Sequence, residues 1–168
     1  KGVYRLFQLS RNLEIVLVEL VLFLLLAGYL FGPRGFSGAM GGDFVPAEME
    51  QVQILLQGSG EHRNDDRSIL LTPDQPAYQE LIAKLENKRY VPYYLESKQR
   101  DVPLDYWVTL IFTLPDDRGV RTYAFSGDRA VDTAGSDTRD RTFQLWDSAA
   151  FQQSVLDFLL EQEYTVPE

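Results

Sequence analysis

The chain has no cysteine and a single histidine in 168 residues. Without thiols it forms no disulfide, holds no thiolate metal ligand and offers no cysteine nucleophile or lipid-modified cysteine. A zinc site would have to combine His62 with carboxylates alone, which suits zinc poorly. We therefore expect neither a metal nor a cofactor.

Positive charge is scarce over most of the sequence. From Val45 onward 22 acidic residues face 12 basic ones, and the net charge of the whole chain is −9. An acidic body repels phosphate backbones, so we expect no nucleic-acid partner. The first twelve residues are the exception, because they contain Lys1, Arg5 and Arg11 and no acid. A basic tip, an apolar stretch and an acidic body thus follow one another.

The apolar stretch runs from Leu13 to Phe31 and is interrupted only by Glu14 and Glu19. Nineteen helical residues extend roughly 28 Å, close to the ~30 Å hydrocarbon core of a bilayer. The sequence therefore predicts a cytoplasmic tip at 1–12 and a single transmembrane helix at 13–31 in contact with the lipid bilayer. The positive-inside rule places everything after it outside the cytoplasm. Glu19 would lie at or within the bilayer boundary, where it predicts an intramembrane contact with a polar partner.

Three alternatives to a membrane anchor remain open at this point. A cleaved signal peptide would combine the basic tip with the apolar region Leu20 to Phe31 and the small residues Ser37 and Ala39, and it would give a secreted protein. A helix buried in a soluble assembly would explain the two glutamates. The segment is also compatible with the first span of a larger permease-like protein.

The residues after the apolar stretch are rich in glycine. Residues 32–43 contain five glycines and one proline, a composition typical of a mobile connector. We therefore expect a flexible spacer at 32–44, with neither helix nor strand, and a folded extracytoplasmic domain at 45–168.

Hydrophobic periodicity within 45–168 predicts an α+β fold. The clearest signal is a hairpin of two strands, 106–114 and 120–125, joined by the turn at 115–119. Further strands are expected at 51–57, 68–72, 87–95 and 142–146, with helices at 74–87 and after Asp147. The buried stripe of the last helix is predicted to consist of Phe151, Val155, Phe158 and Leu159. This order predicts a mainly antiparallel sheet with two helices packed on one face.

Three segments carry a resemblance to known proteins. They read DQPAYQELIAKLEN, YWVTLIFTLPDDRGVRTYAF and TFQLWDSAAFQQSVLDFLL. Over residues 50–162 this pattern resembles the small uncharacterised domains that Gram-positive bacteria display outside the membrane on anchored proteins and lipoproteins. The resemblance implies an extracytoplasmic location and an α+β fold, and it brings no catalytic residue with it.

Two polar clusters suggest chemistry. His62 lies near Ser59, Ser68, Asp65 and Asp66, so a hydrolase could use it as general base, although a solvated loop explains the same residues. The other cluster consists of Asp128, Asp132, Asp137 and Asp140, which would suit calcium. Its spacing is not that of a calcium loop and arginines interleave, so we interpret it as a solvated, mutually paired loop.

An aromatic group has more functional promise. It consists of Tyr90, Tyr93, Tyr94, Tyr106 and Trp107. Consecutive strand residues face opposite ways, so some of these rings must point away from the core and could form a docking surface, unless a helix or the segment 90–104 covers them. The sequence thus favours a non-enzymatic membrane-anchored extracytoplasmic module that binds or senses a protein partner, either alone or as an accessory subunit of a membrane complex. The alternatives are a secreted or anchored hydrolase centred on His62 and part of a permease-like protein.

Overall fold

The computed structural model describes residues 2–41, 44–93, 104–127, 130–136 and 138–166. The chain divides into two units, Lys1–Gly32 and Pro33–Glu168, of which the first consists of the helix α1 (Gly2–Phe31). Within α1, the 19 residues Leu13–Phe31 have a mean hydropathy of 2.4, and none of them is buried. The described part of the chain therefore has one helix that is long and apolar enough to cross a membrane, a property that signal sequences share.

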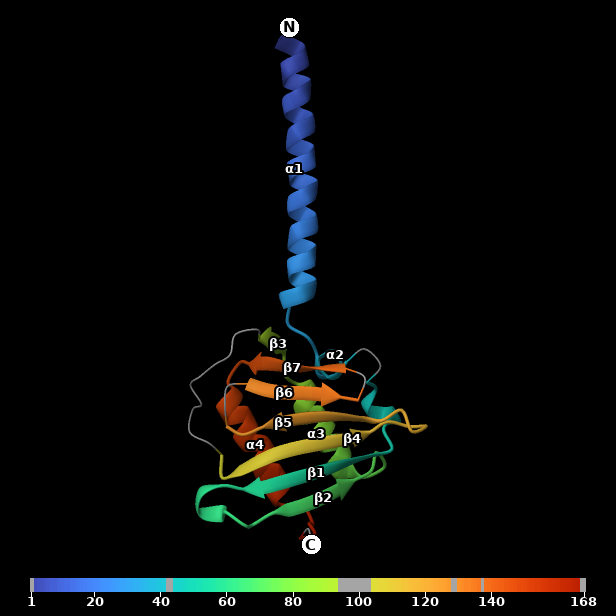
Figure 1. Cartoon of the computed structure of the whole chain (residues 1–168), viewed down its shortest axis with the longest axis vertical. Helices are drawn as coiled ribbons and strands as arrows, with labels where there is room; N and C mark the ends of the chain where they lie inside the picture. Colours follow the sequence, from blue (N-terminus) through green and yellow to red (C-terminus); the bar gives the residue numbers. More distant parts are fainter. Residues whose placement is uncertain (1, 42–43, 94–103, 128–129, 137, 167–168) are drawn as a thin grey trace. The chain divides into compact units, whose positions relative to one another are not determined.

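The second unit is built on a seven-stranded antiparallel sheet with the order β2-β1-β4-β5-β6-β7-β3 (Figure 1). The strands are β1 (Gln51–Gly58), β2 (Arg67–Leu71), β3 (Tyr90–Tyr93), β4 (Tyr106–Thr113), β5 (Val120–Phe125), β6 (Ala130–Gly135) and β7 (Thr138–Leu145). The predicted hairpin is present as β4 and β5, with Leu110 opposite Tyr123. In the turn between β4 and β5, Asp116 and Asp117 both have positive φ, a conformation that aspartate tolerates better than most residues.

Helices cover one face of the sheet. They are α2 (Phe36–Met40), α3 (Pro76–Glu86) and α4 (Ser148–Leu160), and short 3₁₀ turns occupy Pro46–Glu48 and Gly60–His62. Figure 1 shows α3 and α4 crossing behind the strands. The predicted stripe of α4 is confirmed, because Phe151, Val155, Phe158 and Leu159 are all buried. The α+β fold with two long helices on one face of an antiparallel sheet is likewise confirmed.

The expectation of a spacer without structure is wrong. Residues 36–40 form α2, and Phe36, Ala39, Met40 and the nearby Phe44 are almost fully buried. The Phe36 ring meets Phe44 edge-on at a centroid distance of 5.4 Å, and it meets Tyr123 of β5 at 5.6 Å. The glycines allow the backbone to turn, and the apolar residues between them pack into the core of the domain. The folded unit therefore begins at Pro33 rather than at residue 45.

The expectation of a solvated loop between β5 and the last strand is also wrong. Residues 130–135 form β6, and β7 begins at Thr138 rather than at residue 142. Val131 and Thr133 are buried while Asp132 between them is exposed, which is the ordinary alternation of a strand with one wet face. Of the aspartates that suggested a loop, the two that the structure describes, Asp132 and Asp140, occupy exposed positions of this hairpin.

Both outer edges of the sheet are closed by single bridges from the ends of the domain. At the β3 edge, Arg34 and Tyr90 exchange backbone hydrogen bonds of 2.8 and 2.9 Å. At the β2 edge, Ser68 and Thr165 do the same at 2.8 Å each. Such caps reduce the unpaired backbone that an edge strand offers to other chains. They also fix the first residues of the domain to one edge and the last residues to the other.

Replacing Phe36 by alanine tests whether α2 is part of the core. Loss of a fully buried phenylalanine costs about 3–5 kcal/mol, so we expect a correspondingly lower free energy of unfolding for the Phe36→Ala chain. Urea unfolding of the full chain in mild detergent, followed by tryptophan fluorescence, measures it. Ser37→Ala in the same helix is the matched control, because Ser37 is only half-buried. Equal stability of the two variants would contradict the packing of α2.

Candidate functional site

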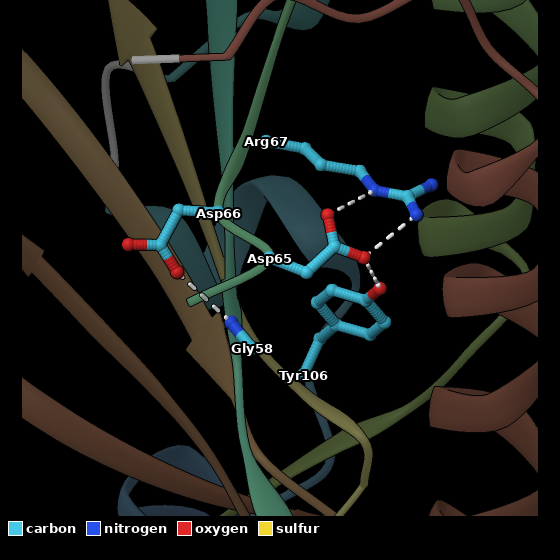
Figure 2. A network of polar contacts seen from close by, with 5 residues as sticks. All are labelled: Gly58, Asp65, Asp66, Arg67 and Tyr106. Carbon is cyan, nitrogen blue, oxygen red and sulfur yellow. Dashed lines mark hydrogen bonds and ion pairs between the residues drawn. The ribbon is translucent and has the colours of Figure 1, made fainter. Parts of the chain in front are cut away.

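The loop between β1 and β2 contains the densest polar network of the described residues. The Asp65 carboxylate accepts hydrogen bonds from Arg67 Nε at 3.1 Å, from Arg67 Nη2 at 2.8 Å and from the Tyr106 hydroxyl (Figure 2). Its neighbour Asp66 accepts a bond of 3.1 Å from the backbone N–H of Gly58. Because Tyr106 lies opposite Gly58 in the pairing of β4 with β1, these contacts tie both ends of the loop to the sheet.

Aromatic rings complete this network. The Arg67 guanidinium lies 4.5 Å from the Tyr164 ring centroid and 5.6 Å from that of Tyr106, and the His62 ring stacks on Tyr106 at 5.4 Å. Hydrogen bonds from Arg67 and then from Tyr106 lower the pKa of Asp65 to about 2. Burial, with a smaller effect of Asp65, raises the pKa of Tyr106 to about 12. At neutral pH the carboxylate is therefore charged and the phenol is neutral, which suits a structural clamp better than proton transfer.

The residues of the hydrolase hypothesis are not arranged as a catalytic triad within the described part of the chain. The Ser59 hydroxyl donates to the backbone carbonyl of Leu104 at 2.6 Å rather than to His62. Both oxygens of Asp65 are already engaged by Arg67 and Tyr106. The geometry of these residues therefore gives no support to nucleophilic catalysis.

Two of the aspartates considered for calcium, Asp132 and Asp140, lie on the strands of the β6–β7 hairpin. Asp132 accepts a hydrogen bond of 2.8 Å from Thr142, and Asp140 is exposed on β7. Asp128 and Asp137 lie outside the described residues. Among the residues that are described, no three His, Cys, Asp or Glu side chains gather closely enough to hold a metal ion.

The described members of the aromatic group do not lie together on one docking surface, because Tyr90 and Tyr106 belong to the core. Tyr90 is fully buried, with its hydroxyl donating to the Leu85 carbonyl at 2.9 Å, and Tyr106 is buried in the network described above. Tyr90 and Tyr93 lie on β3, three strands away from β5 and four from β4, where Trp107 is located. Tyr94 lies outside the described residues. Of the four members that the structure describes, Trp107 is the ring that is substantially exposed, at 45%.

Trp107 belongs to a larger surface, the face of the sheet that α2, α3 and α4 leave uncovered, which we call the open face. Strand alternation places on it the exposed or half-exposed apolar residues Leu55, Leu70, Val91, Trp107, Ile111 and Val120. Threonines and glutamines lie between them, among them Gln53, Thr109, Thr122 and Gln144. Where the strand register is regular, Asp132 is the ionised group among the described positions of this face, and Thr142 donates to it.

A partly apolar, hydrogen-bonding surface with little charge resembles the centre of a protein interface, where charged residues are depleted. The sequence contains the signal for it in the alternation of β1, β4 and β5, whose second faces lack charge. Comparison of the chain with models of protein families, with curated proteins and with solved structures gave no match. The open face is therefore a candidate site on the strength of its geometry and chemistry.

The loop network predicts a pH dependence of stability. The pKa of Asp65 is lowered in the folded chain, so its contribution to stability is present above its ordinary pKa of 3.8 and is lost as the pH falls towards about 2. We expect the Asp65→Asn chain to melt below the wild type at pH 6, with the gap closing between pH 4 and about 2. Thermal melts of the full chain across this range measure the gap. Glu86→Gln removes an exposed carboxylate from α3 and is the control; an identical pH profile for the two variants would refute the clamp.

Proposed function

We propose that the chain is a membrane-anchored binding module, in which α1 crosses the bilayer and the open face receives a protein partner outside the cytoplasm. The observation that carries this proposal is a pair of apolar surfaces left uncovered by the fold. One is the entire length Leu13–Phe31 of α1, and the other is the open face. The two surfaces have different chemistry and call for different occupants.

The surface of α1 suits lipid. Its large apolar side chains from Leu13 to Phe31 are between 39% and 77% exposed, and leaving them in water would cost about 25 cal/mol for each Å². The domain needs no help from α1, since Phe36 and Phe44 already complete its core. Lys1, Arg5 and Arg11 precede the apolar stretch, which supports a cytoplasmic N-terminus and an extracytoplasmic domain.

Glu19 is an acidic residue within the proposed membrane-spanning segment and therefore needs a polar partner or a proton. It is the seventh residue of the apolar window, which corresponds to a depth of about 9 Å from its start. An acidic side chain at depth costs a few kcal/mol unless it is protonated or meets a polar group. Contact of Glu19 with a polar side chain of another membrane helix would remove this cost, so an accessory role beside a second membrane protein follows naturally.

The open face suits a protein rather than lipid or nucleic acid. Threonine and glutamine side chains offer hydrogen bonds at intervals between apolar groups, and Trp107 provides a large ring of the type that dominates interface energetics. The acidic balance of the domain disfavours a phosphate-rich partner. An antiparallel sheet supports such residues on a hydrogen-bonded frame.

A photo-cross-linking experiment tests this function. A photoreactive amino acid replaces Leu70, which is 55% exposed on the open face, and another replaces Ala83 on the solvent side of α3. In intact cells that make the protein, we expect a discrete adduct from position 70 and none from position 83. Trp107→Ala should lower the yield of that adduct about tenfold or more, since central aromatic residues of interfaces contribute ~2 kcal/mol.

Two results would contradict the proposal. Equal adducts from positions 70 and 83, or an adduct from position 70 that survives Trp107→Ala unchanged, would remove the binding role of the open face. Extraction of the chain from membranes by an alkaline wash would remove the anchoring role of α1, because a spanning helix resists that treatment.

A further inference from the structure

One edge of the domain differs from the rest of its surface in charge. Arg89 directly precedes β3, and Arg139 and Arg141 lie on β7 where it extends past the end of β3. All three are exposed, and no ion pair joins them to a carboxylate of the described residues. Asp140 is the acid between them. The opposite edge, at β2 and its preceding loop, contains Glu61, Asp65 and Asp66 together with Arg63 and Arg67, so acids outnumber bases there by one, whereas bases outnumber acids at the β3–β7 edge.

The same edge has the most exposed large aromatic side chain among the described residues of the domain. Trp146 follows β7 directly and is 86% exposed. Its neighbour Leu145 pairs with Tyr90, the residue that the Arg34 bridge joins to the start of the domain. A tryptophan that is so little buried contributes almost nothing to the stability of the core. In membrane proteins, tryptophan is enriched at the interface between lipid and water.

Chain length ties this edge to the end of α1. Phe31 is the last residue of α1, and three residues further on Arg34 is hydrogen-bonded to Tyr90 at 2.8 and 2.9 Å. Three residues reach at most about 10 Å. If α1 ends at the surface of a bilayer, the edge formed by β3 and β7 cannot be far from the headgroups. A distance of 10 Å is about one Debye length at physiological ionic strength, so charges there are not fully screened.

We propose that the β3–β7 edge rests on anionic lipid headgroups, with Arg89, Arg139 and Arg141 facing phosphates and Trp146 inserted at the interface. This inference depends on the anchoring part of the proposed function. The β2 edge, where acids outnumber bases by one, is separated from this edge by six strand spacings, about 29 Å.

The two tryptophans of the chain make this testable without a label. Trp107→Phe leaves Trp146 as the sole indole, and Trp146→Phe leaves Trp107. Each full-length variant is reconstituted into phosphatidylcholine vesicles with or without 30% phosphatidylglycerol, prepared from lipids brominated near the headgroup end of the acyl chains. With phosphatidylglycerol present, we expect bromine to reduce the emission of Trp146 at least twofold and that of Trp107 hardly at all.

The charged residues are tested in the same vesicles. Arg139→Gln with Arg141→Gln, in the variant that retains Trp146, should weaken the docked state roughly fivefold for each charge, and 0.5 M salt should do the same. Arg63→Gln with Arg118→Gln removes two exposed charges away from the edge and should leave the quenching unchanged.

The possible outcomes distinguish failure of the membrane anchor from failure of the headgroup contact. Failure of the chain to float with vesicles of either composition would refute the anchor itself. Stable flotation together with equal quenching of the two tryptophans, or with quenching indifferent to phosphatidylglycerol and to the two arginines, would refute the headgroup contact alone. The arginines would then serve only to keep the edge solvated.

Discussion

Packing of the segment around α2 against the helix-covered face of the sheet determines how the rest of the chain is arranged. Phe36 and Phe44 meet Phe112 of β4 at ring centroid distances of 6.0 and 5.1 Å, and Phe36 also meets Tyr123 of β5. Thr133 of β6 donates to the Ala39 carbonyl at 3.3 Å. These contacts draw the first residues of the domain onto the sheet, so the backbone of Arg34 reaches Tyr90 at the β3 edge.

Covering one face of the sheet has a consequence for the other. The helices and α2 supply enough apolar surface for a single core, and the second face is left with residues that tolerate both water and contact, such as Thr109, Ile111 and Gln144. Antiparallel sheets allow this because alternate residues face alternate sides. The proposed binding surface therefore arises from the same alternation that builds the core.

Much of the fold followed from the sequence where periodicity was undisturbed. Alternation in β1 and β4 and the helical stripe from Phe151 to Leu159 identified those elements correctly. The segment at 36–40 was missed because five glycines in residues 32–43 outweighed two phenylalanines, although the aromatic rings decide its burial. The strand β6 was missed because the charge of Asp132 suggested a loop, whereas Val131 and Thr133 on either side enter the core.

The candidate site was harder to predict than the fold. Tyr90 and Tyr106 suggested a docking surface by residue type, yet both are buried, and only tertiary structure distinguishes a tyrosine that completes a core from one that meets a partner. Trp146 is the last residue of the strand predicted at 142–146. Its exposure could not be predicted, because it depends on β7 ending at Leu145. The difference in charge between the β3–β7 edge and the β2 edge depends on the order of the strands in the sheet, which could not be predicted from the sequence.

Amide hydrogen exchange of the full chain in lipid vesicles tests most directly whether the segment after α1 is an integral part of the domain. If α2 and the Arg34 bridge are as described, the amides of Arg34, Ala39 and Tyr90 exchange as slowly as those of the central strands β4 and β5. Exchange of Arg34 and Ala39 at the rate of an unstructured peptide, with β4 and β5 still protected, would contradict the account and restore a flexible tether.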